Sequence, residues 1–267
     1  TSIDLGEYVI NPFRGCAFSC LYCYVRSNRA ALLKKEPWGS YVDIRVNAPE
    51  LLERELASKK PRQVLLGSTT ECFQPVEAKI RLTDKLIMIL HKAQVGYVIL
   101  TRSPLILEYV PLLKKGFCRR IYFTVNCFSD RFKQRLEPKS PSFQERDQAV
   151  EKLLAEGLPV VPYFSPVLPW ISDLRGVFSR FSNAERVEFE CLNFRLHNID
   201  EIINNIGIID RGLKEKYLRV TRDKDFYLKL WQGLEKNIRV QAEDAGKQYR
   251  LFLHGFARFF ENSYQRE

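Results

Sequence analysis

No fourth cysteine follows the one cysteine-rich stretch of this sequence, and histidine is scarce. Cys16, Cys20 and Cys23 stand in a C-x3-C-x2-C arrangement, whereas the three histidines of the chain are scattered far from it. A structural zinc site needs four ligands that close its coordination shell, usually from two paired halves. The missing second half argues against a structural zinc site here.

Long apolar runs, linkers and internal repeats are missing as well. No apolar run approaches the length of a membrane-spanning helix, and the first residues do not have the pattern of a signal peptide. Seven cysteines, an odd number, in a chain of 267 residues are unlike the disulfide framework of a small secreted protein. We therefore expect a cytoplasmic protein with no membrane partner, built as one domain or as one domain with a tail.

Acidic residues are fewer than basic residues. The chain has 32 acidic and 42 basic residues, which gives a formal net charge of +10. Such an excess favours polyanionic partners, with nucleic acid first, but it also serves ordinary solubility. Charge alone does not separate these two interpretations.

What the sequence does contain is a set of three thiols that can reach one metal cluster. Thiolates are the usual ligands of iron–sulfur clusters, and three of them can each bind a different iron of a 4Fe–4S cubane. One iron then stays open to bind another molecule. Gly15 lets the backbone approach the cluster, and Pro12 stiffens the start of the loop. Cys16, Cys20 and Cys23 are therefore the candidate metal ligands.

Apolar runs rich in β-branched and aromatic residues recur along the chain, with amphipathic stretches between them. The runs lack a strict alternation, which indicates strands buried on both faces. The predicted strands cover residues 8–10, 63–67, 97–101, 120–125, 159–164 and 186–191. The predicted helices cover residues 49–57, 83–93, 104–115 and 143–156, and Thr83 and Ser142 are two expected N-caps.

Alternating strands and helices predict a parallel sheet. About six such units around one site fit an α/β fold of the partial (β/α)6 barrel type, whose chemistry lies at the carboxyl ends of the strands. The cysteine loop and residues 67–71, 101–103 and 124–127 all follow a predicted strand. We expect these four polar segments to lie at one edge of the sheet.

The pattern changes after residue 198. The expected domains are a barrel over residues 1–198 and a mainly helical C-terminal extension over residues 199–267 that packs on it. The extension contains predicted helices at 200–215 and 223–244, a short strand at 251–253 and a basic aromatic tail at 256–264. We expect its aromatic residues to pack on the fold rather than to stack on bases: Tyr217, Phe226, Tyr227 and Trp231.

The spacing of the three cysteines, with the aromatic Tyr22 just before Cys23, resembles that of the radical S-adenosylmethionine (SAM) enzymes. The resemblance implies that the open iron of a 4Fe–4S cluster chelates the amino and carboxylate groups of SAM. It also implies that one electron, from a donor such as flavodoxin or ferredoxin, cleaves SAM to a 5′-deoxyadenosyl radical. That radical then abstracts a hydrogen atom from the substrate.

Further segments extend the resemblance over residues 5–196. They occur in the order expected of successive βα units. They are Gly15-Cys16, Tyr22-Cys23-Tyr24, Gly67-Ser68-Thr69-Thr70-Glu71, Gln74-Pro75-Val76-Glu77, Leu82-Thr83, Thr101-Arg102-Ser103-Pro104, Phe123-Thr124-Val125-Asn126, Glu137-Pro138, Ser142-Phe143, Glu145-Arg146 and Glu188-Phe189-Glu190. With these segments the chain resembles the spore photoproduct lyase-like, or SplB-like, family.

This family resemblance implies contacts to the amino acid part of SAM. Ser68, Thr69 and Thr70 would orient its amino group through hydroxyl and carbonyl groups. Arg102 matches a lysine of the lyase that meets the SAM carboxylate, and an arginine can hold a carboxylate with two hydrogen bonds. For Thr69 and Glu71, a role in a turn or a helix cap is an equal alternative.

The resemblance also implies contacts to the nucleoside part of SAM. Thr124 and Asn126 would bind the ribose hydroxyls. Tyr22 would pack near the adenine.

One position departs from the lyase. In the lyase, a cysteine in the loop after the second strand returns a hydrogen atom to the substrate radical, and the matching residue here is Ser68. A hydroxyl donates a hydrogen atom less readily than a thiol, so repair of spore photoproduct itself is not the expected reaction. Cys72 and Cys127 are the candidate catalytic cysteines. Cys118 and Cys191 are expected to be ordinary buried cysteines.

Three classes of function remain open. The leading hypothesis is a radical SAM enzyme, lyase-like or carrying out another radical transformation, that acts on a nucleic-acid or nucleotide-like substrate. The second keeps this chemistry but places it on a peptide, a protein or a small metabolite. The third is a non-catalytic protein that uses an iron–sulfur cluster for folding or redox sensing.

Overall fold

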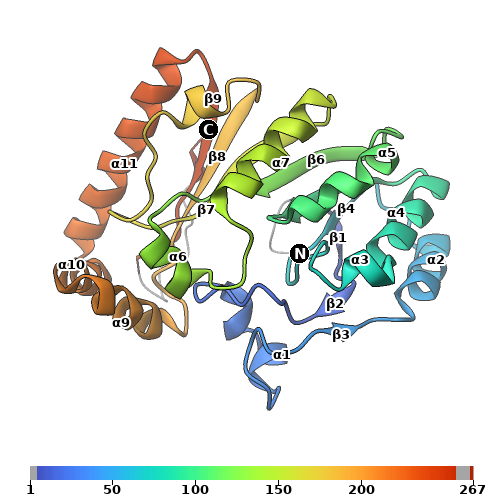
Figure 1. Cartoon of the computed structure of the whole chain (residues 1–267), viewed down its shortest axis with the longest axis horizontal. Coiled ribbons are helices and arrows are strands. Elements are labelled where there is room, and N and C mark those ends of the chain that lie inside the picture. Colours follow the sequence, from blue (N-terminus) through green and yellow to red (C-terminus); the bar gives the residue numbers. More distant parts are fainter. Residues whose placement is uncertain (1–4, 257–264, 267) are drawn as a thin grey trace. The chain divides into compact units, whose positions relative to one another are not determined.

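The structure is a computed structural model that describes residues 5–256 and 265–266. Helices and strands alternate along the chain, which confirms the predicted α/β class (Figure 1). The chain divides into two compact units. The first takes the residues up to Ser19 with Lys35–Thr124 and Ser140–Val161, and the second takes Cys20–Lys34, Val125–Lys139 and the residues from Pro162 onward.

The first unit contains four parallel strands, which neighbour one another in the order β1–β4–β5–β6. Leu65, Ile99 and Phe123 on these strands are fully buried, as expected for strands covered on both faces. The strand bounds are β1 (Tyr8–Ile10), β4 (Gln63–Leu66), β5 (Gly96–Thr101) and β6 (Cys118–Thr124), close to the predicted ones.

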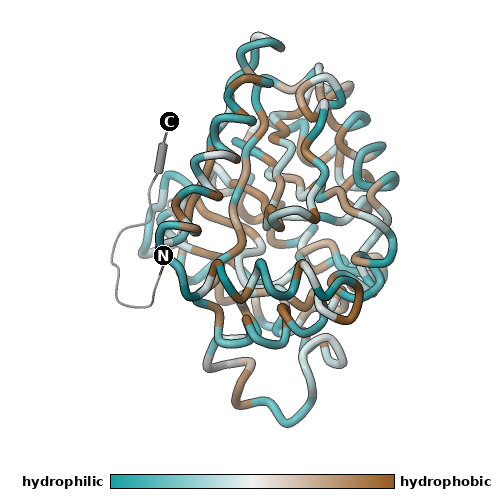
Figure 2. The backbone as a smooth tube through the Cα atoms, turned by 90° about the vertical axis from the view of Figure 1, so that its left-hand side faces the viewer, coloured by the Kyte–Doolittle hydropathy of each residue, from teal (hydrophilic) through white to brown (hydrophobic). Residues whose placement is uncertain are grey.

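Helices follow the strands of this unit, and α2 and α4 lie side by side. A core cluster of Phe13, Leu82 and Leu86 packs against partly buried residues that include Ile10 and Leu52. Brown and teal stretches alternate along the turns of the helices in Figure 2, as amphipathic helices require. The other elements are β2 (Phe13–Arg14) paired with β3 (Asp43–Ile44), α2 (Ala48–Ser58), α3 (Glu77–Ile80), α4 (Leu82–Lys92), the 3-10 helix η2 (Pro104–Tyr109), α5 (Val110–Leu113) and α7 (Phe143–Ala155).

The expected N-cap at Ser142 is confirmed. Its hydroxyl accepts from the Glu145 backbone N–H at 3.2 Å, and the Glu145 carboxylate accepts from the Ser142 backbone N–H at 2.7 Å. Together these bonds form a capping box at the start of α7.

Two predictions about helices in this unit are wrong. Thr83 is not an N-cap, because α4 begins at Leu82 after Arg81, which adopts a left-handed conformation. Residues 104–115 do not form one helix but split into η2 and α5. Pro111 has no backbone N–H to donate to the preceding turn, which accounts for the break.

The second unit contains β7 (Val160–Val167), whose first two residues belong to the first unit, β8 (Arg186–Cys191), β9 (Gln248–Phe252) and β10 (Gln265–Arg266). Strands β7, β8 and β9 run parallel, and β10 pairs antiparallel with β9. Phe164 of β7 stacks on Phe189 of β8 at 5.4 Å between ring centroids, and both are buried. β9 confirms the last predicted strand, with a start earlier than expected.

The helical C-terminal region is also confirmed, as Figure 1 shows in orange and red. Tyr217, Tyr227 and Trp231 are buried around Phe194, so the expected packing of the aromatic residues is confirmed for these three. The helices of this unit are η1 (Tyr24–Ser27), α1 (Arg29–Leu32), α6 (Asp130–Leu136), α8 (Val177–Arg180), α9 (Ile199–Ile209), α10 (Arg211–Arg222) and α11 (Lys224–Asp244).

The single helix expected over 200–215 is wrong, because α9 ends at Ile209. Asp210 adopts an extended conformation there, and its carboxylate accepts from the Leu213 backbone N–H at 3.0 Å to cap α10. Most of the expected tail at 256–264 lies outside the described residues. The domain boundary at residue 198 stays a prediction. In the part of the chain that the structure describes, none of the helices combines the length and apolar character needed to cross a bilayer.

Candidate active site

The first half of the cysteine loop lies in the first unit, where two hydrogen bonds hold it. The Thr70 hydroxyl donates to the Gly15 carbonyl at 2.6 Å, and the Ala17 backbone N–H donates to Gln74 Oε1 at 2.9 Å. Gly15 has a φ of +91°, and a Cβ atom there would lie 2.4 Å from the Tyr41 carbonyl oxygen. Only glycine fits this position. The loop is thereby fixed to the segment that follows β4.

The second half of the loop lies in the second unit and is held through Leu21. Its backbone N–H donates to the Leu136 carbonyl at 2.8 Å, at the end of α6. Its carbonyl accepts from the Asn198 side chain at 2.7 Å, just before α9. Cys20 is buried, and Cys16 and Cys23 are half-buried.

All seven cysteines are free thiols, so the chain has no disulfide framework. Among the residues that the structure describes, no three histidine, cysteine or acidic side chains already lie close enough to hold one metal ion. Assignment of a cluster therefore rests on the spacing and chemistry of the thiols. Three thiolates from one loop that contains no further cysteine fit an iron–sulfur cluster with one open iron.

Polar residues after β4 and β5 meet at Glu71, which is buried. Its carboxylate accepts from the Thr101 hydroxyl at 2.7 Å and from the backbone N–H groups of Arg102 and Phe73, each at 3.0 Å. Burial raises the pKa of Glu71 above its ordinary value, although the three donors favour the carboxylate. Glu71 ties the loop after β4 to the end of β5 and so fixes the backbone at Arg102.

The hydroxyl residues after β4 are held by Asn11, which the sequence reasoning missed. Its side chain donates to Ser68 Oγ at 3.4 Å and accepts from the Thr69 backbone N–H at 2.9 Å. Ser68 and Thr69 are half-buried, and Thr70 is buried. Asn11 directly follows β1, which pairs in parallel with β4. This position is the one feature of the sequence from which the contact could have been predicted.

In the second unit, Tyr22 and Asn126 share one buried network. The Tyr22 hydroxyl donates to Glu137, and the Asn126 side-chain N–H groups lie 3.1 Å from Tyr22 Oη, Glu137 Oε1 and the Ser165 carbonyl. Asn126 Oδ1 is buried and has no donor among the described residues. An orphaned acceptor of this kind fits a ligand hydroxyl.

A second polar network in this unit centres on Glu190 of β8, for which the sequence reasoning gave no role. Its carboxylate accepts from the Tyr163 hydroxyl at 2.9 Å and from the Ser165 hydroxyl at 2.5 Å, and it lies 3.1 Å from His254 Nε2. Burial raises the pKa of Glu190, but the hydrogen bonds from His254, Ser165 and Tyr163 outweigh it. That pKa is therefore held below its ordinary value.

A model of the radical SAM superfamily matches residues 10–173, more than half of the chain. The protein belongs to the radical SAM superfamily. An uncharacterised protein of Methanocaldococcus jannaschii is 30% identical over 86% of this chain and 91% of its own length. An uncharacterised protein of Mycobacterium tuberculosis is 25% identical over 62% of this chain. The match covers 51% of the length of the mycobacterial relative, so the chain spans about half of that protein.

Solved structures of radical SAM enzymes have the same fold. A spore photoproduct lyase variant superposes with a TM-score of 0.56 at 18% identity, over 75% of this chain and 60% of the lyase chain. SuiB of Streptococcus suis, bound to its precursor peptide SuiA, superposes with a TM-score of 0.51 at 13% identity, over 76% of this chain and 46% of its own. These likenesses confirm the radical SAM fold that the sequence predicted.

Membership of the radical SAM superfamily identifies the chain as an enzyme. At the level of the superfamily, it also assigns SAM and an iron–sulfur cluster to the chain. Of the SAM-binding residues predicted from the sequence, Ser68, Thr69, Thr70, Arg102 and Thr124 lie in the first unit. Tyr22 and Asn126 lie in the second.

The two candidate catalytic cysteines differ in their surroundings. Cys72 in the first unit is fully buried, and burial together with the nearby carboxylates of Glu71 and Glu77 raises the pKa of its thiol well above the ordinary value. Its hydrogen therefore stays on sulfur at neutral pH. Cys127 in the second unit is half-buried. Cys118 and Cys191 are buried, as predicted.

Proposed function

We propose that Cys16, Cys20 and Cys23 hold a 4Fe–4S cluster at which SAM is cleaved, and that the chain directs the resulting radical to a nucleic-acid or nucleotide-like substrate. When bound, the cluster and SAM would supply one-electron cleavage of SAM and abstraction of a hydrogen atom. The observation that carries the proposal is the three-thiol loop, whose Gly15 carbonyl is bound by Thr70 beyond the end of β4.

The proposed task of the surrounding residues is to bind and orient SAM. Glu71 fixes the backbone of Arg102, whose guanidinium would hold the SAM carboxylate. Asn11 fixes Ser68 and Thr69, which with Thr70 would take the amino group. These roles agree with the family resemblance, and the hydrogen bonds of the buried Glu71 and the half-buried Asn11 support the rigidity that they require.

Asn126, Thr124 and Tyr22 are the proposed contacts to the nucleoside part of SAM. The orphaned Asn126 Oδ1 supports a hydrogen bond from a ribose hydroxyl. The proposed electron donor is a protein such as flavodoxin or ferredoxin. The proposed compartment is the reducing cytoplasm.

The substrate is proposed from charge and from the family. A net charge of +10 suits a polyanion. Ser68 at the place of the lyase's hydrogen-donating cysteine disfavours repair of spore photoproduct itself, so another lyase-like or radical reaction is proposed. A peptide, protein or small-metabolite substrate is the alternative, and a structural neighbour crystallised with its precursor peptide keeps that alternative in view.

Anaerobic reconstitution tests the first half of the proposal. The wild-type chain should bind about four irons, and replacement of Cys16, Cys20 and Cys23 by alanine should abolish the iron and its absorbance. Cys118→Ala is the matched control, because Cys118 is a buried thiol on β6 outside the loop. Unchanged iron in the triple variant would refute the assignment.

Reductive cleavage of SAM separates an enzyme from a non-catalytic iron–sulfur protein. The reduced, reconstituted chain should form 5′-deoxyadenosine from SAM. A stable cluster that leaves SAM intact would instead support a role in folding or redox sensing.

A further inference from the structure

Trp170 occupies a tight turn just after β7, at a position that disfavours a large side chain. The Ile171 backbone N–H donates to the Leu168 carbonyl at 3.1 Å, with Pro169 and Trp170 between them. Trp170 has a φ of +60°, a value that glycine or asparagine normally supplies at the third position of such a turn. A bulky residue there is an outlier and suggests a function for the side chain.

Neighbouring residues of the second unit hold this turn in place. The Tyr217 hydroxyl donates to the Pro169 carbonyl at 2.9 Å, and the Ser172 hydroxyl accepts from the Leu168 backbone N–H at 2.8 Å. The Trp170 ring lies edge-on to Tyr217 at 5.8 Å and stacks on Phe226 at 6.1 Å, measured between ring centroids. Even so, Trp170 remains 42% exposed. The ring is held in position and is only partly covered.

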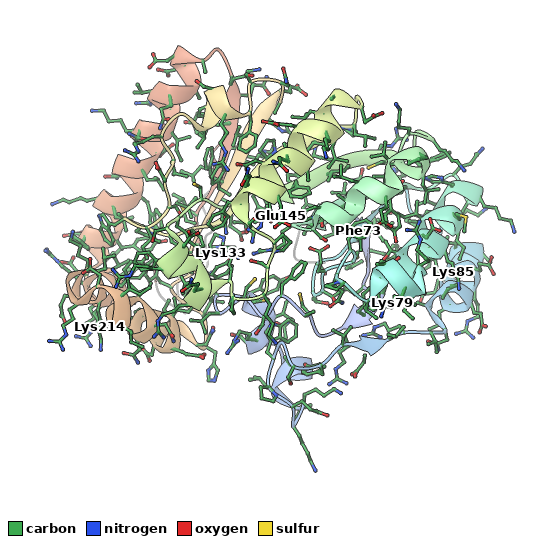
Figure 3. The ribbon with its side chains drawn as sticks, in the orientation of Figure 1. Phe73, Lys79, Lys85, Lys133, Glu145 and Lys214 are labelled. Atoms are coloured by element: carbon green, nitrogen blue, oxygen red, sulfur yellow. The ribbon has the colours of Figure 1, made fainter. Side chains whose placement is uncertain are left out.

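One basic side chain lies over each of the two stacked rings, Trp170 and Phe226. Lys216 Nζ lies 5.5 Å from the Trp170 ring centroid, and Arg219 Cζ lies 4.3 Å from that of Phe226. Both cations come from α10, which contains five basic residues and one acidic residue, Glu215. Lys214 of the same helix is labelled in Figure 3. The exposed basic residues of α10 are Arg211, Lys216, Arg219 and Arg222.

The acidic residues at the two ends of α10 are already engaged. Asp210 caps α10, and Asp223 caps α11 through the Phe226 backbone N–H at 2.9 Å while it also pairs with Arg219. Asp223 therefore offsets part of the charge of Arg219, and Arg211, Lys216 and Arg222 carry the rest of the exposed positive charge of α10.

We propose that Trp170 and the exposed face of α10 bind single-stranded nucleic acid, with one base stacked on Trp170 and phosphates on Lys216, Arg219 and Arg222. Aromatic rings among basic residues are the usual platform for unpaired bases, whereas bases inside a duplex are covered by their neighbours. This inference rests on the nucleic-acid part of the proposed function and assigns it a surface outside the cluster loop.

The test uses the reconstituted chain of 267 residues and a fluorescein-labelled 15-nucleotide oligo(dT), with binding followed by fluorescence anisotropy. Trp170→Gly should weaken binding about tenfold or more, because stacking on one base is lost. Glycine accepts a φ of +60°, which offsets part of the packing on Tyr217 and Phe226 that is lost with the ring. Lys216→Glu with Arg222→Glu should flatten the slope of log K against log salt by about 0.7 for each phosphate contact removed.

Tyr8→Ala is the matched control, since Tyr8 is 43% exposed and has Lys59 Nζ 5.1 Å from its ring centroid. It should bind oligo(dT) like the wild type, and basal SAM cleavage should be unchanged in Trp170→Gly. Wild-type binding by Trp170→Gly, or equal affinity of the wild type for a poly-glutamate peptide, would overturn the proposed surface. No binding of oligo(dT) by the wild type would overturn it together with the nucleic-acid substrate, while SAM cleavage would still stand.

Discussion

Arg102 takes its place from a backbone hydrogen bond to Glu71 Oε2, and its own side chain is half-exposed. Arg102→Ala should weaken SAM binding about 10- to 100-fold, because a charge-assisted contact to the carboxylate contributes about 1.5–3 kcal/mol. Anaerobic equilibrium dialysis would measure the affinity, and the absorbance of the cluster should not change.

Lys85→Ala is a matched control for loss of a cation, since Lys85 is exposed on α4 (Figure 3). SAM affinity equal to the wild type in Arg102→Ala would make Arg102 a turn residue without contact to SAM.

We propose Cys72 as the thiol that returns a hydrogen atom to the substrate radical. Its raised pKa keeps the S–H bond intact at neutral pH, which a hydrogen-atom donor needs. Cys72→Ala should still cleave SAM but lose or divert the product, as mass spectrometry of the reaction would show. If Cys72→Ala and Cys127→Ala both turn over fully, the hydrogen atom returns from 5′-deoxyadenosine or solvent.

Single residues also show how far the sequence could predict local structure. Ser142 and Glu145 stand three apart before an amphipathic run, so their capping box could be predicted. Thr83 looked equally suitable as a cap. Glu77 performs that task instead, since its carboxylate accepts from the backbone N–H groups of Leu82 and Thr83. A cap supplied by another helix leaves no local pattern.

At the scale of elements, the bend after β4 depends on Gly67. Its φ is +85°, and a Cβ atom there would lie 2.9 Å from the Leu100 carbonyl oxygen and 3.1 Å from Cys72 Sγ. Gly67→Ala should lower the free energy of unfolding by about 1–3 kcal/mol or more, because it adds backbone strain and a collision with β5. Chemical denaturation would measure the loss.

Gly233→Ala provides a control of opposite sign. Gly233 lies within α11, and apart from its chain neighbours and the nearby backbone of α11, no described residue comes within 4 Å of a Cβ atom built there. Alanine should raise the free energy of unfolding by about 0.5–1 kcal/mol, since glycine is the poorer residue in a helix. Equal effects of the two substitutions would show that the conformation at Gly67 is not constrained.

Strands could be predicted more reliably than helix ends. The apolar runs at β4, β5, β6 and β8 are short and bounded by polar residues, so each reads as one buried strand. The helical stretches at 104–115 and 200–215 keep a helical period across an interruption. Pro111 interrupts the first stretch because it has no backbone N–H to donate, and Asp210 interrupts the second because its side chain caps a new helix. Hydrophobic periodicity reveals neither interruption.

At the scale of the whole molecule, folding stability should depend on pH through Glu190. Its pKa in the fold lies below the ordinary value of 4.5, so its stabilising hydrogen bonds are present above that pH. They are lost as the pH falls through the folded-state pKa. Glu190→Gln should reduce stability at pH 7 by about 1 kcal/mol, and its difference from the wild type should vanish in acid.

Thermal unfolding between pH 7 and pH 3 would test this, with wild type and variant compared at each pH. The comparison is needed because Glu71 acts in the opposite direction. Its pKa is raised by burial, so its contribution falls as the pH rises above 4.5. A difference between the two proteins that stays constant over this range would contradict the assignment to Glu190.

The candidate site could be predicted from the sequence only where its chemistry is local. The three cysteines are close in sequence, and the residues after β4 and β5 follow obvious strands. Glu190 and His254 are different, because their contact depends on β9 returning beside β8 after three helices. The strained turn at Trp170 could not be predicted either, because a tryptophan rarely adopts a positive φ.

The return of β9 also has a consequence for how the chain folds during synthesis. Arg186 pairs with Gln248, so β8 is made long before β9, its second neighbour in the sheet, exists. At about 5–20 residues per second, the ribosome needs roughly 3 to 12 seconds to supply β9. Through that interval the nascent chain presents an open strand edge, a template for aggregation. Expression at high ribosome density should therefore favour inclusion bodies, and slower initiation should favour the folded protein.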